Sequence, residues 1–306
     1  MLRLILTRLV QIPFILATIF FVTFILAWLV PGNPLESEDR NVPPEIREAM
    51  LRQYSLHDPW AFVTEYLVGV FTRADFGPSL YYRDQTVANI LAAGLPVSVA
   101  LGMAAMIVAC FIGVVTGIVG ALRPRSWVDH ASMLLALVGV SLPSFVTAAI
   151  LLVLFAGVLQ WVPAAGWGNP QQIILPAIAL GLMPAAYIAR LVRIGLIDAM
   201  ASDHVRTACA KGLSRHQALL RHALKLALLP VVSFLGPASA ATFTGSFVIE
   251  KVFEIPGIGR DFVNAVLNKD QFLILGLVLV YSSMLIFFNL IVDVAYAWLD
   301  PRIELD

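Results

Sequence analysis

The stretch that decides the fold is residues 202–230, SDHVRTACAKGLSRHQALLRHALKLALLP. It is the one long segment dense in charge that keeps a helical pattern, in a chain whose residues are 59% hydrophobic. Asp203 is placed to cap a short first helix, and Gly212 is placed to end it, because glycine adopts the left-handed conformation without a Cβ clash. Ser214 and Gln217 have the spacing of a capping box, which predicts the start of a second helix. We therefore expect a helical hairpin with a glycine at its turn.

The predicted hairpin is basic and lies between two apolar segments. Lys and Arg are enriched in the cytoplasmic loops of membrane proteins, so we expect the hairpin on the cytoplasmic side. An exposed, charged hairpin that continues into apolar helices favours a role as a docking lever for a soluble motor. Its cations are Arg206, Lys211, Arg215, Arg221 and Lys225.

The composition is that of an integral membrane protein. Only 13% of the 306 residues are charged, whereas soluble domains are about a quarter charged. Several apolar runs reach the ~20 residues that a helix needs to cross the bilayer. These runs are continuous rather than alternating, which favours an all-α membrane protein over a β-barrel. The formal net charge is zero, which gives no support to nucleic-acid binding.

We expect six membrane spans, with both termini in the cytoplasm. The first apolar run is too long for a signal peptide and no A-x-A cleavage site follows it, so we interpret it as an uncleaved span. The predicted spans are 9–30, 95–122, 131–159, 173–189, 223–249 and 272–299.

The predicted organisation follows from these spans. Residues 1–30 form the N-terminal span, and residues 31–94 form a long acidic extracytoplasmic region with short helices at 41–56 and 59–71. Residues 95–300 form a core of five spans that contains the cytoplasmic loop 202–222. Residues 301–306 form a cytoplasmic tail.

Small residues and prolines mark particular faces of the predicted spans. Gly113, Gly117 and Gly120 form a small-residue face that lets helices approach closely. Pro143 interrupts the third span, and the fifth span contains a Gly-Pro break. Its small and hydroxyl residues suit the lining of a translocation path, although such hydroxyls also bond to their own backbone. These candidate path residues are Gly236, Ser239, Thr242, Thr244 and Ser246.

Residues for catalysis or metal binding are not apparent in the sequence. The chain has no G-x-x-x-x-G-K-[ST], H-E-x-x-H or G-x-S-x-G motif. His204, His216 and His222 lie near one another, and we favour exposed histidines over a metal site. The only acid well inside a predicted span is Asp293, for which we expect a packing or gating role. An ion-driven transporter would need coupling acids at mid-membrane and usually an internal repeat, and neither is found.

Motifs along nearly the whole chain resemble ABC-transporter permeases of the oligopeptide/dipeptide/nickel branch, most closely its oligopeptide permease members. The run from Arg206 to Gly212, with His222-Ala-Leu and Leu228-Leu-Pro230 after it, is similar to the EAA loop of that family. The supporting motifs are Pro31-Gly-Asn-Pro34, Asp75-Phe-Gly-Pro-Ser79, Arg190-x-x-Arg193, Gly245-Ser-Phe-Val-Ile-Glu250, Pro256-Gly-Ile-Gly259, Phe262-Val-Asn-Ala-Val-Leu-Asn268 and Asp300-Pro-Arg-Ile303.

The resemblance implies a type I importer fold in a bacterial inner membrane. It implies a second homologous permease subunit, two ATPase subunits that carry ATP and Mg, and an extracytoplasmic solute-binding protein, with no cofactor on this chain. Oligopeptides or dipeptides are the implied solutes, and nickel, glutathione or another small solute stays open. The implied ATPase-coupling residues are Asp203, Arg206, Thr207, Ala208, Ala210, Lys211, Gly212, Leu213 and Ser214. The implied gate or structural residues are Glu250, Pro256, Gly257, Gly259 and Asp293.

Overall fold

The computed structural model describes residues 2–30, 44–82 and 84–299 of the chain. Within these residues every element is helical, apart from one isolated bridge between Pro78 and Thr86. The elements are α1 (Leu2–Leu29), α2 (Pro44–Gln53), α3 (Pro59–Arg73), α4 (Val87–Leu122), α5 (Trp127–Ser141), α6 (Ser144–Leu151), η1 (Leu152–Val158), η2 (Pro170–Ile173), α7 (Ile174–Ala201), α8 (Asp203–Ala210), α9 (Arg215–Ala218), η3 (Leu219–Ala223), α10 (Leu224–Ala227), α11 (Leu229–Val252), α12 (Ile258–Leu267) and α13 (Gln271–Leu299).

The described helices account for six spans if two bent pairs each count as one. Single helices long and apolar enough to cross a membrane occupy Val10–Leu29, Val87–Leu122, Pro170–Ala201 and Gln271–Ile291. The first bent pair is Trp127–Ser141 with Ser144–Val158, where the helix axis bends by 109°. The second is Arg215–Ala227 with Leu229–Phe243, where it bends by 46°. The all-α membrane fold expected from the sequence is therefore confirmed.

Two helices extend beyond the spans predicted from the sequence. Helix α4 begins at Val87 rather than Leu95, and α7 continues past Ala189 to Ala201. The motif Pro256-Gly-Ile-Gly259 runs from a loop into a helix, because α12 begins at Ile258 and includes Gly259. The tail 301–306, the segment 31–43 and the side chain of Thr244 lie outside the described residues.

The described residues fall into two compact units. The first comprises residues 2–5, 99–255 and 285–299, and the second comprises residues 6–30, 44–82, 84–98 and 256–284. In the second unit, aromatic rings of α1, α3 and α13 pack together, with Phe62 stacked on Tyr66 and 5.0 Å from Phe272 between ring centroids. Asp58 caps α3 by accepting from the backbone N–H groups of Trp60 and Ala61.

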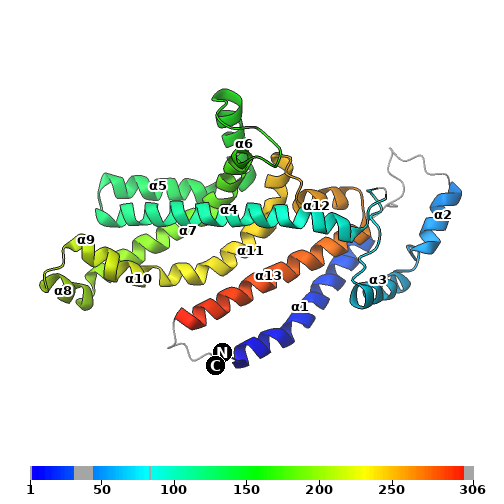
Figure 1. Ribbon diagram of the computed structural model, residues 1–306, viewed down its shortest axis with the longest axis horizontal. Coiled ribbons are helices and arrows are strands. Elements are labelled where there is room, and N and C mark those ends of the chain that lie inside the picture. The colour runs from blue at the N-terminus through cyan, green and yellow to red at the C-terminus, as the bar shows by residue number, and fades with distance from the viewer. Residues whose placement is uncertain (1, 31–43, 83, 300–306) are drawn as a thin grey trace. The chain divides into compact units, whose positions relative to one another are not determined.

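Helices α4 and α7 of the first unit pack backbone to backbone. A methyl group on Gly113 would lie 2.7 Å from the carbonyl oxygen of Ala185, and one on Gly117 would lie 2.6 Å from that of Ala189. These distances leave no room for a side chain, which confirms the small-residue face predicted from the sequence. Helix α7 also packs against α5, α6, α10 and α11, which makes it the central element of this unit. The α8–α9 hairpin lies beyond its C-terminal end (Figure 1).

Candidate coupling hairpin and translocation face

The predicted helical hairpin is present, and its turn has a regular helix-ending geometry. After α8, the N–H of Leu213 bonds to the carbonyl oxygen of Ala208 and the N–H of Gly212 bonds to that of Cys209. This is the Schellman arrangement, in which the residue after the C-cap takes a left-handed conformation. Gly212 does so with a φ of 96°. A methyl group there would contact nothing within 4 Å, so the turn requires glycine for its backbone conformation rather than for space.

The start of each hairpin helix gives one correction and one confirmation. The N-cap of α8 is Ser202, and Asp203 is the first helical residue, where its charge complements the helix dipole instead of capping it. Ser214 caps α9 as predicted. Its Oγ accepts from the Gln217 N–H at 3.3 Å, and the Gln217 Oε1 accepts from the Ser214 N–H at 3.2 Å.

The hairpin has an outward polar face and an inward apolar face. Val205 and Ala208, three residues apart on α8, are buried. Ala208 was expected to contact an ATPase subunit, but its side chain is buried on the inward, apolar face of the hairpin. Leu213 is partly buried, and the remaining predicted coupling residues are exposed: Asp203, Arg206, Thr207, Ala210, Lys211, Gly212 and Ser214.

The inward face joins the hairpin to α7 through one continuous apolar cluster. The segment 219–227 (η3 and α10), which follows the hairpin, is its return arm. Side chains of the hairpin and of this arm, including Val205 and Leu219, pack with Leu196 and Ala199 near the end of α7. Gly195 is so close to α10 that a methyl group on it would lie 2.9 Å from the Cα of Ala227. The hairpin is therefore packed directly against the C-terminal part of α7.

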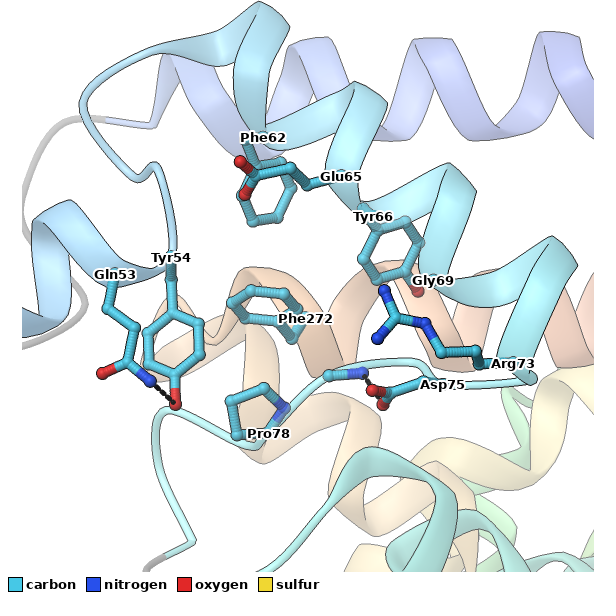
Figure 2. A pocket seen from close by; sticks show the side chains of 11 residues that line it. Gln53, Tyr54, Phe62, Glu65, Tyr66, Gly69, Arg73, Asp75, Pro78 and Phe272 are labelled. Atoms are coloured by element: carbon cyan, nitrogen blue, oxygen red, sulfur yellow. Dashed lines mark hydrogen bonds between the residues drawn. The ribbon is translucent and has the colours of Figure 1, made fainter.

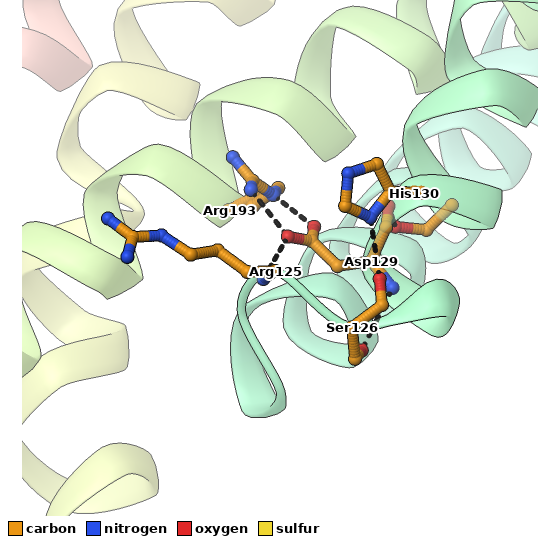
Figure 3. A network of polar contacts seen from close by, with 6 residues as sticks. Arg125, Ser126, Asp129, His130 and Arg193 are labelled. Carbon is orange, nitrogen blue, oxygen red and sulfur yellow. Dashed lines mark hydrogen bonds and ion pairs between the residues drawn. The ribbon is translucent and has the colours of Figure 1, made fainter.

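A buried ion pair that the sequence analysis missed lies further along α7. The Arg193 guanidinium donates from Nε to Oδ1 of Asp129 and from Nη2 to Oδ2 at 2.6 Å, and Figure 3 shows the two groups facing each other. The Arg125 N–H donates to the same Oδ2 at 2.9 Å. Asp129 is only 2% exposed. The pair links α5, the loop before it and α7.

The candidate path residues on α11 fall into two groups. Gly236, Thr242 and Ser246 are buried, and Ser239 is partly buried. The Thr242 Oγ1 contacts the Met106 sulfur at 3.5 Å, and the Ser246 Oγ donates to the Phe243 carbonyl oxygen at 2.8 Å. Most of these polar groups thus have partners inside the unit.

A cavity lies beside these residues, between α6, α7 and α11. Its volume is about 320 Å³, and its walls are mainly apolar. Tyr187 and Phe234 stand on facing helices with ring centroids 5.5 Å apart. Thr242 is the one candidate path residue that lines the cavity. The other lining residues are Ser144, Leu180, Met183, Pro184, Tyr187, Phe234, Pro237, Ala238 and Ala241.

The residues expected to act as gate or structural elements lie near helix ends. Glu250 is fully buried in the last turn of α11, where its carbonyl oxygen accepts from the Ile255 N–H at 2.8 Å. Pro256 is exposed, and Gly257 is the N-cap of α12. Gly259 is buried in the first turn of that helix. Asp293 is partly buried on α13.

The second unit holds a further buried acid, Asp270, that the sequence analysis did not single out. Its Oδ2 accepts from the Ser79 Oγ at 2.5 Å and the Tyr81 N–H at 3.0 Å. Its Oδ1 accepts from the Leu273 N–H at 3.2 Å, so Asp270 caps α13 while it holds the loop after α3.

A smaller polar cluster of the same unit joins α12 to the loop before α4. The Tyr82 hydroxyl donates to Asp261 Oδ1 at 2.9 Å and accepts from Asn264 Nδ2 at 3.0 Å. Burial raises the pKa of Tyr82 to about 12 and raises the pKa of the Asp261 carboxyl above its ordinary value. The phenol therefore stays protonated and able to donate over the whole physiological range.

A mixed polar and aromatic pocket of about 350 Å³ lies between α2, α3 and the start of α13 (Figure 2). Tyr54, Phe62, Tyr66 and Phe272 line it, with Arg73 and other charged side chains beside them. The Tyr66 hydroxyl is buried and has no hydrogen-bond partner among the described residues.

Metal-binding groups are not formed by the described residues. No cluster of three or more His, Cys, Asp or Glu side chains within them is placed to hold a metal ion. His204, His216 and His222 are exposed on the hairpin and its return arm.

Comparison with known proteins agrees with this geometry. Residues 113–305 match the family model of the binding-protein-dependent transport system inner membrane component. The chain is 42% identical to the oligopeptide transport system permease protein OppB of Haemophilus influenzae, over 99% of this chain and 100% of that protein. It is 41% identical to the dipeptide transport system permease protein DppB of Bacillus subtilis, over 92% of each chain.

Solved structures with low sequence identity share the fold. An amino acid ABC transporter crystallised with histidines aligns with a TM-score of 0.53 at 17% identity, over 69% of this chain and 94% of that chain. The inward-facing MetNI methionine ABC transporter aligns with a TM-score of 0.56 at 14% identity, over 70% and 97%. The resemblance and the type I importer fold expected from the sequence are confirmed. The chain belongs to the family of binding-protein-dependent transport system inner membrane components.

Proposed function

We propose that this chain is the membrane permease subunit of an ATP-driven importer and forms half of a translocation path for oligopeptides or dipeptides. The observation that carries the mechanism is the exposed α8–α9 hairpin, whose apolar root is continuous with α7. The solute class is supported by near full-length identity of 41–42% to permeases named for oligopeptide and dipeptide transport. On this proposal the chain is a transport subunit and carries no catalytic residues.

The proposed assembly contains a second homologous permease, two ATPase subunits with ATP and Mg, and an extracytoplasmic solute-binding protein. It sits in a bacterial inner membrane with the hairpin and both termini in the cytoplasm. The long region 31–94 then faces the outside, in keeping with its acidic composition. The outward face of α8 binds an ATPase, and ATP-driven closure of the two ATPases moves the hairpin.

The hairpin movement is passed to the spans that border the cavity. Helix α7 packs against the hairpin and also carries four of the residues that line the cavity, namely Leu180, Met183, Pro184 and Tyr187. Rigid-body alternation of such helices opens a path to one side of the membrane and closes it to the other. We place the solute path along the exposed faces of α7 and α11 at this cavity, where Pro237 and Ala241 are exposed. Apolar walls suit solutes whose side chains vary.

Gly212→Asp tests the coupling role. A side chain at a φ of 96° strains the turn, so we expect the variant to insert normally and to lose solute uptake. Gly168→Asp is the matched control, because Gly168 has a φ of 120° and equally open surroundings, but lies in the loop before η2. Gly212→Asn should retain more uptake than Gly212→Asp, because Asn and Asp tolerate the left-handed conformation similarly but Asn adds no negative charge at the C-terminal end of α8, where the helix dipole is already negative.

The assay measures ATP-dependent uptake into vesicles that hold the assembled complex, at matched membrane abundance. Uptake by Gly212→Asp equal to that of Gly168→Asp would contradict the coupling role. Labelled oligopeptides and dipeptides are compared with nickel and glutathione in the same vesicles. Uptake of nickel or glutathione without peptide uptake would reject the proposed solute class and leave the importer mechanism intact.

A further inference from the structure

Helix α5 packs along α7 mainly through apolar and small side chains. Only three of its residues are buried, namely Asp129, Ser132 and Gly139. Asp129 and Ser132 belong to the ion-pair site, where the Ser132 Oγ donates to the Asp129 carbonyl oxygen at 2.8 Å. Gly139 marks a second close approach to α7, since a methyl group there would lie 3.2 Å from the Leu182 carbonyl oxygen, but this contact involves no hydrogen bond. Among the described residues, the hydrogen bonds between α5 and α7 are those of the ion pair, so the directional part of the attachment lies there and the remaining contacts are apolar.

The hydrogen-bonding groups of the ion-pair site are fully used and closely packed. Asp129 accepts two bonds from the Arg193 fork and one from the Arg125 N–H, so both carboxylate oxygens have donors (Figure 3). Bidentate Arg–carboxylate pairs fix orientation as well as distance. Helix α4 closes the site from a third side. A methyl group on Gly120 would lie 2.8 Å from the Ser132 Oγ and 3.3 Å from the Asp129 Oδ1.

The two ends of α5 have different mechanical roles. Its first turn holds the ion pair, whereas its last residue precedes the 109° break to α6. Ser144, the first residue of α6, lines the cavity that we assign to the solute path. Helix α5 thus connects the ion-pair site on α7 to one wall of that cavity, and α6 itself also packs against α7.

We infer that Asp129 and Arg193 are positioning residues that make the bent α5–α6 pair follow α7 when the hairpin moves. This inference rests on the proposed function, because it assigns the pair to the coupling step of transport. Without the pair, the ATPases still dock and the hairpin still drives α7. The wall formed by α6 then no longer moves in register with α7, and ATP is hydrolysed without delivery of solute.

Two variants separate positioning from charge and from folding. The double variant Asp129→Leu with Arg193→Met removes both charges together, which avoids a stranded buried charge and preserves packing. Arg193→Lys keeps the positive charge but loses the planar two-pronged geometry. Arg123→Gln is the control, because Arg123 is an exposed cation of the same loop.

The experiment measures solute uptake and ATP hydrolysis in parallel, in vesicles that contain the full complex. We expect both variants to assemble and to hydrolyse ATP at a rate near that of the unmodified complex. We expect solute delivered per ATP to fall about tenfold, within the range usual for coupling between sites. Arg123→Gln should leave this ratio unchanged.

An unchanged ratio in both variants would overturn the inference. Failure of both variants to accumulate in the membrane would also overturn it, because the pair would then serve folding alone. Absence of ATP-dependent uptake by the unmodified complex is a different result, since it rejects the proposed function itself.

Discussion

Two buried carboxylates, one in each unit, are held in opposite ways. Asp129 in the first unit is 2% exposed and faces the charged guanidinium of Arg193, which comes from another helix. Asp270 in the second unit is fully buried and accepts from neutral donors, namely a serine hydroxyl and two backbone N–H groups. Asp129 depends on a second charge for its stability, whereas Asp270 depends on the local backbone.

The difference shows what each carboxylate holds in place. A buried ion pair between helices fixes their relative orientation, and loss of either partner leaves the other charge uncompensated. A helix cap of the Asp270 kind holds a loop against the start of one helix and strands no cation when it is lost. The first arrangement suits a joint between moving helices, and the second suits a permanent fastening.

The largest expected effect is that of Asp129→Leu alone. This change leaves the partly buried Arg193 guanidinium without its carboxylate, which should cost about 3 kcal/mol of unfolding free energy, the lower end of the range for a broken buried pair. Thermal denaturation of the purified subunit in detergent measures the loss. The double variant with Arg193→Met is the control and should recover most of it. A single variant as stable as the double would show that the charge pair is not what holds α5 to α7.

A smaller loss is expected for Asp270→Asn. The amide retains one acceptor oxygen but presents an NH₂ group to the donors that Asp270 binds, so about 1.5–3 kcal/mol should be lost. Asp75→Asn is the control, because Asp75 is an exposed acid that accepts one N–H bond, from Gly77. The same denaturation assay applies. Equal losses from the two variants would mean that burial adds nothing to the hold of Asp270 on its loop.

The smallest expected effect has the opposite sign. Burial raises the pKa of Tyr66 well above its ordinary value, and its hydroxyl lacks a partner among the described residues. Tyr66→Phe should therefore leave stability unchanged or raise it by about 1 kcal/mol. Tyr82→Phe is the matched contrast, because that hydroxyl bonds to Asp261 and Asn264, and it should lose about 1 kcal/mol. A loss from Tyr66→Phe as large as that from Tyr82→Phe would contradict this.

Local patterns made the hairpin and the glycine face predictable from the sequence. Gly212, Ser214 and Gln217 act within a few residues of one another, so turn and cap chemistry alone indicates their roles. Gly113 and Gly117 share a helix face by spacing alone. The assignment of α8 residues to a face was less secure. Ala208 lies one turn after Val205, and the hairpin's fold places both residues inward.

Contacts between distant residues were not predictable. Asp129 and Arg193 are 64 positions apart, and Asp129 fell just outside the predicted third span. Ser79 and Asp270 are 191 positions apart. Helix α12 was not predicted, because its Pro-Gly start is typical of a turn. These features depend on how helices pack, and a single sequence has no local signal for that.

The return arm of the hairpin contains one residue more than a regular α-helical turn needs. Its segment Leu219–Ala223 is a π-helical turn, in which the Leu224 N–H bonds five residues back to Leu219 rather than four. One deletion within this turn converts it into an ordinary α-turn and leaves the flanking segments aligned. A deletion within α7 instead rotates everything beyond it by about 100° around the helix axis. We therefore expect changes of chain length to be tolerated in the segment that follows the hairpin turn, and not in the helix that leads to the hairpin.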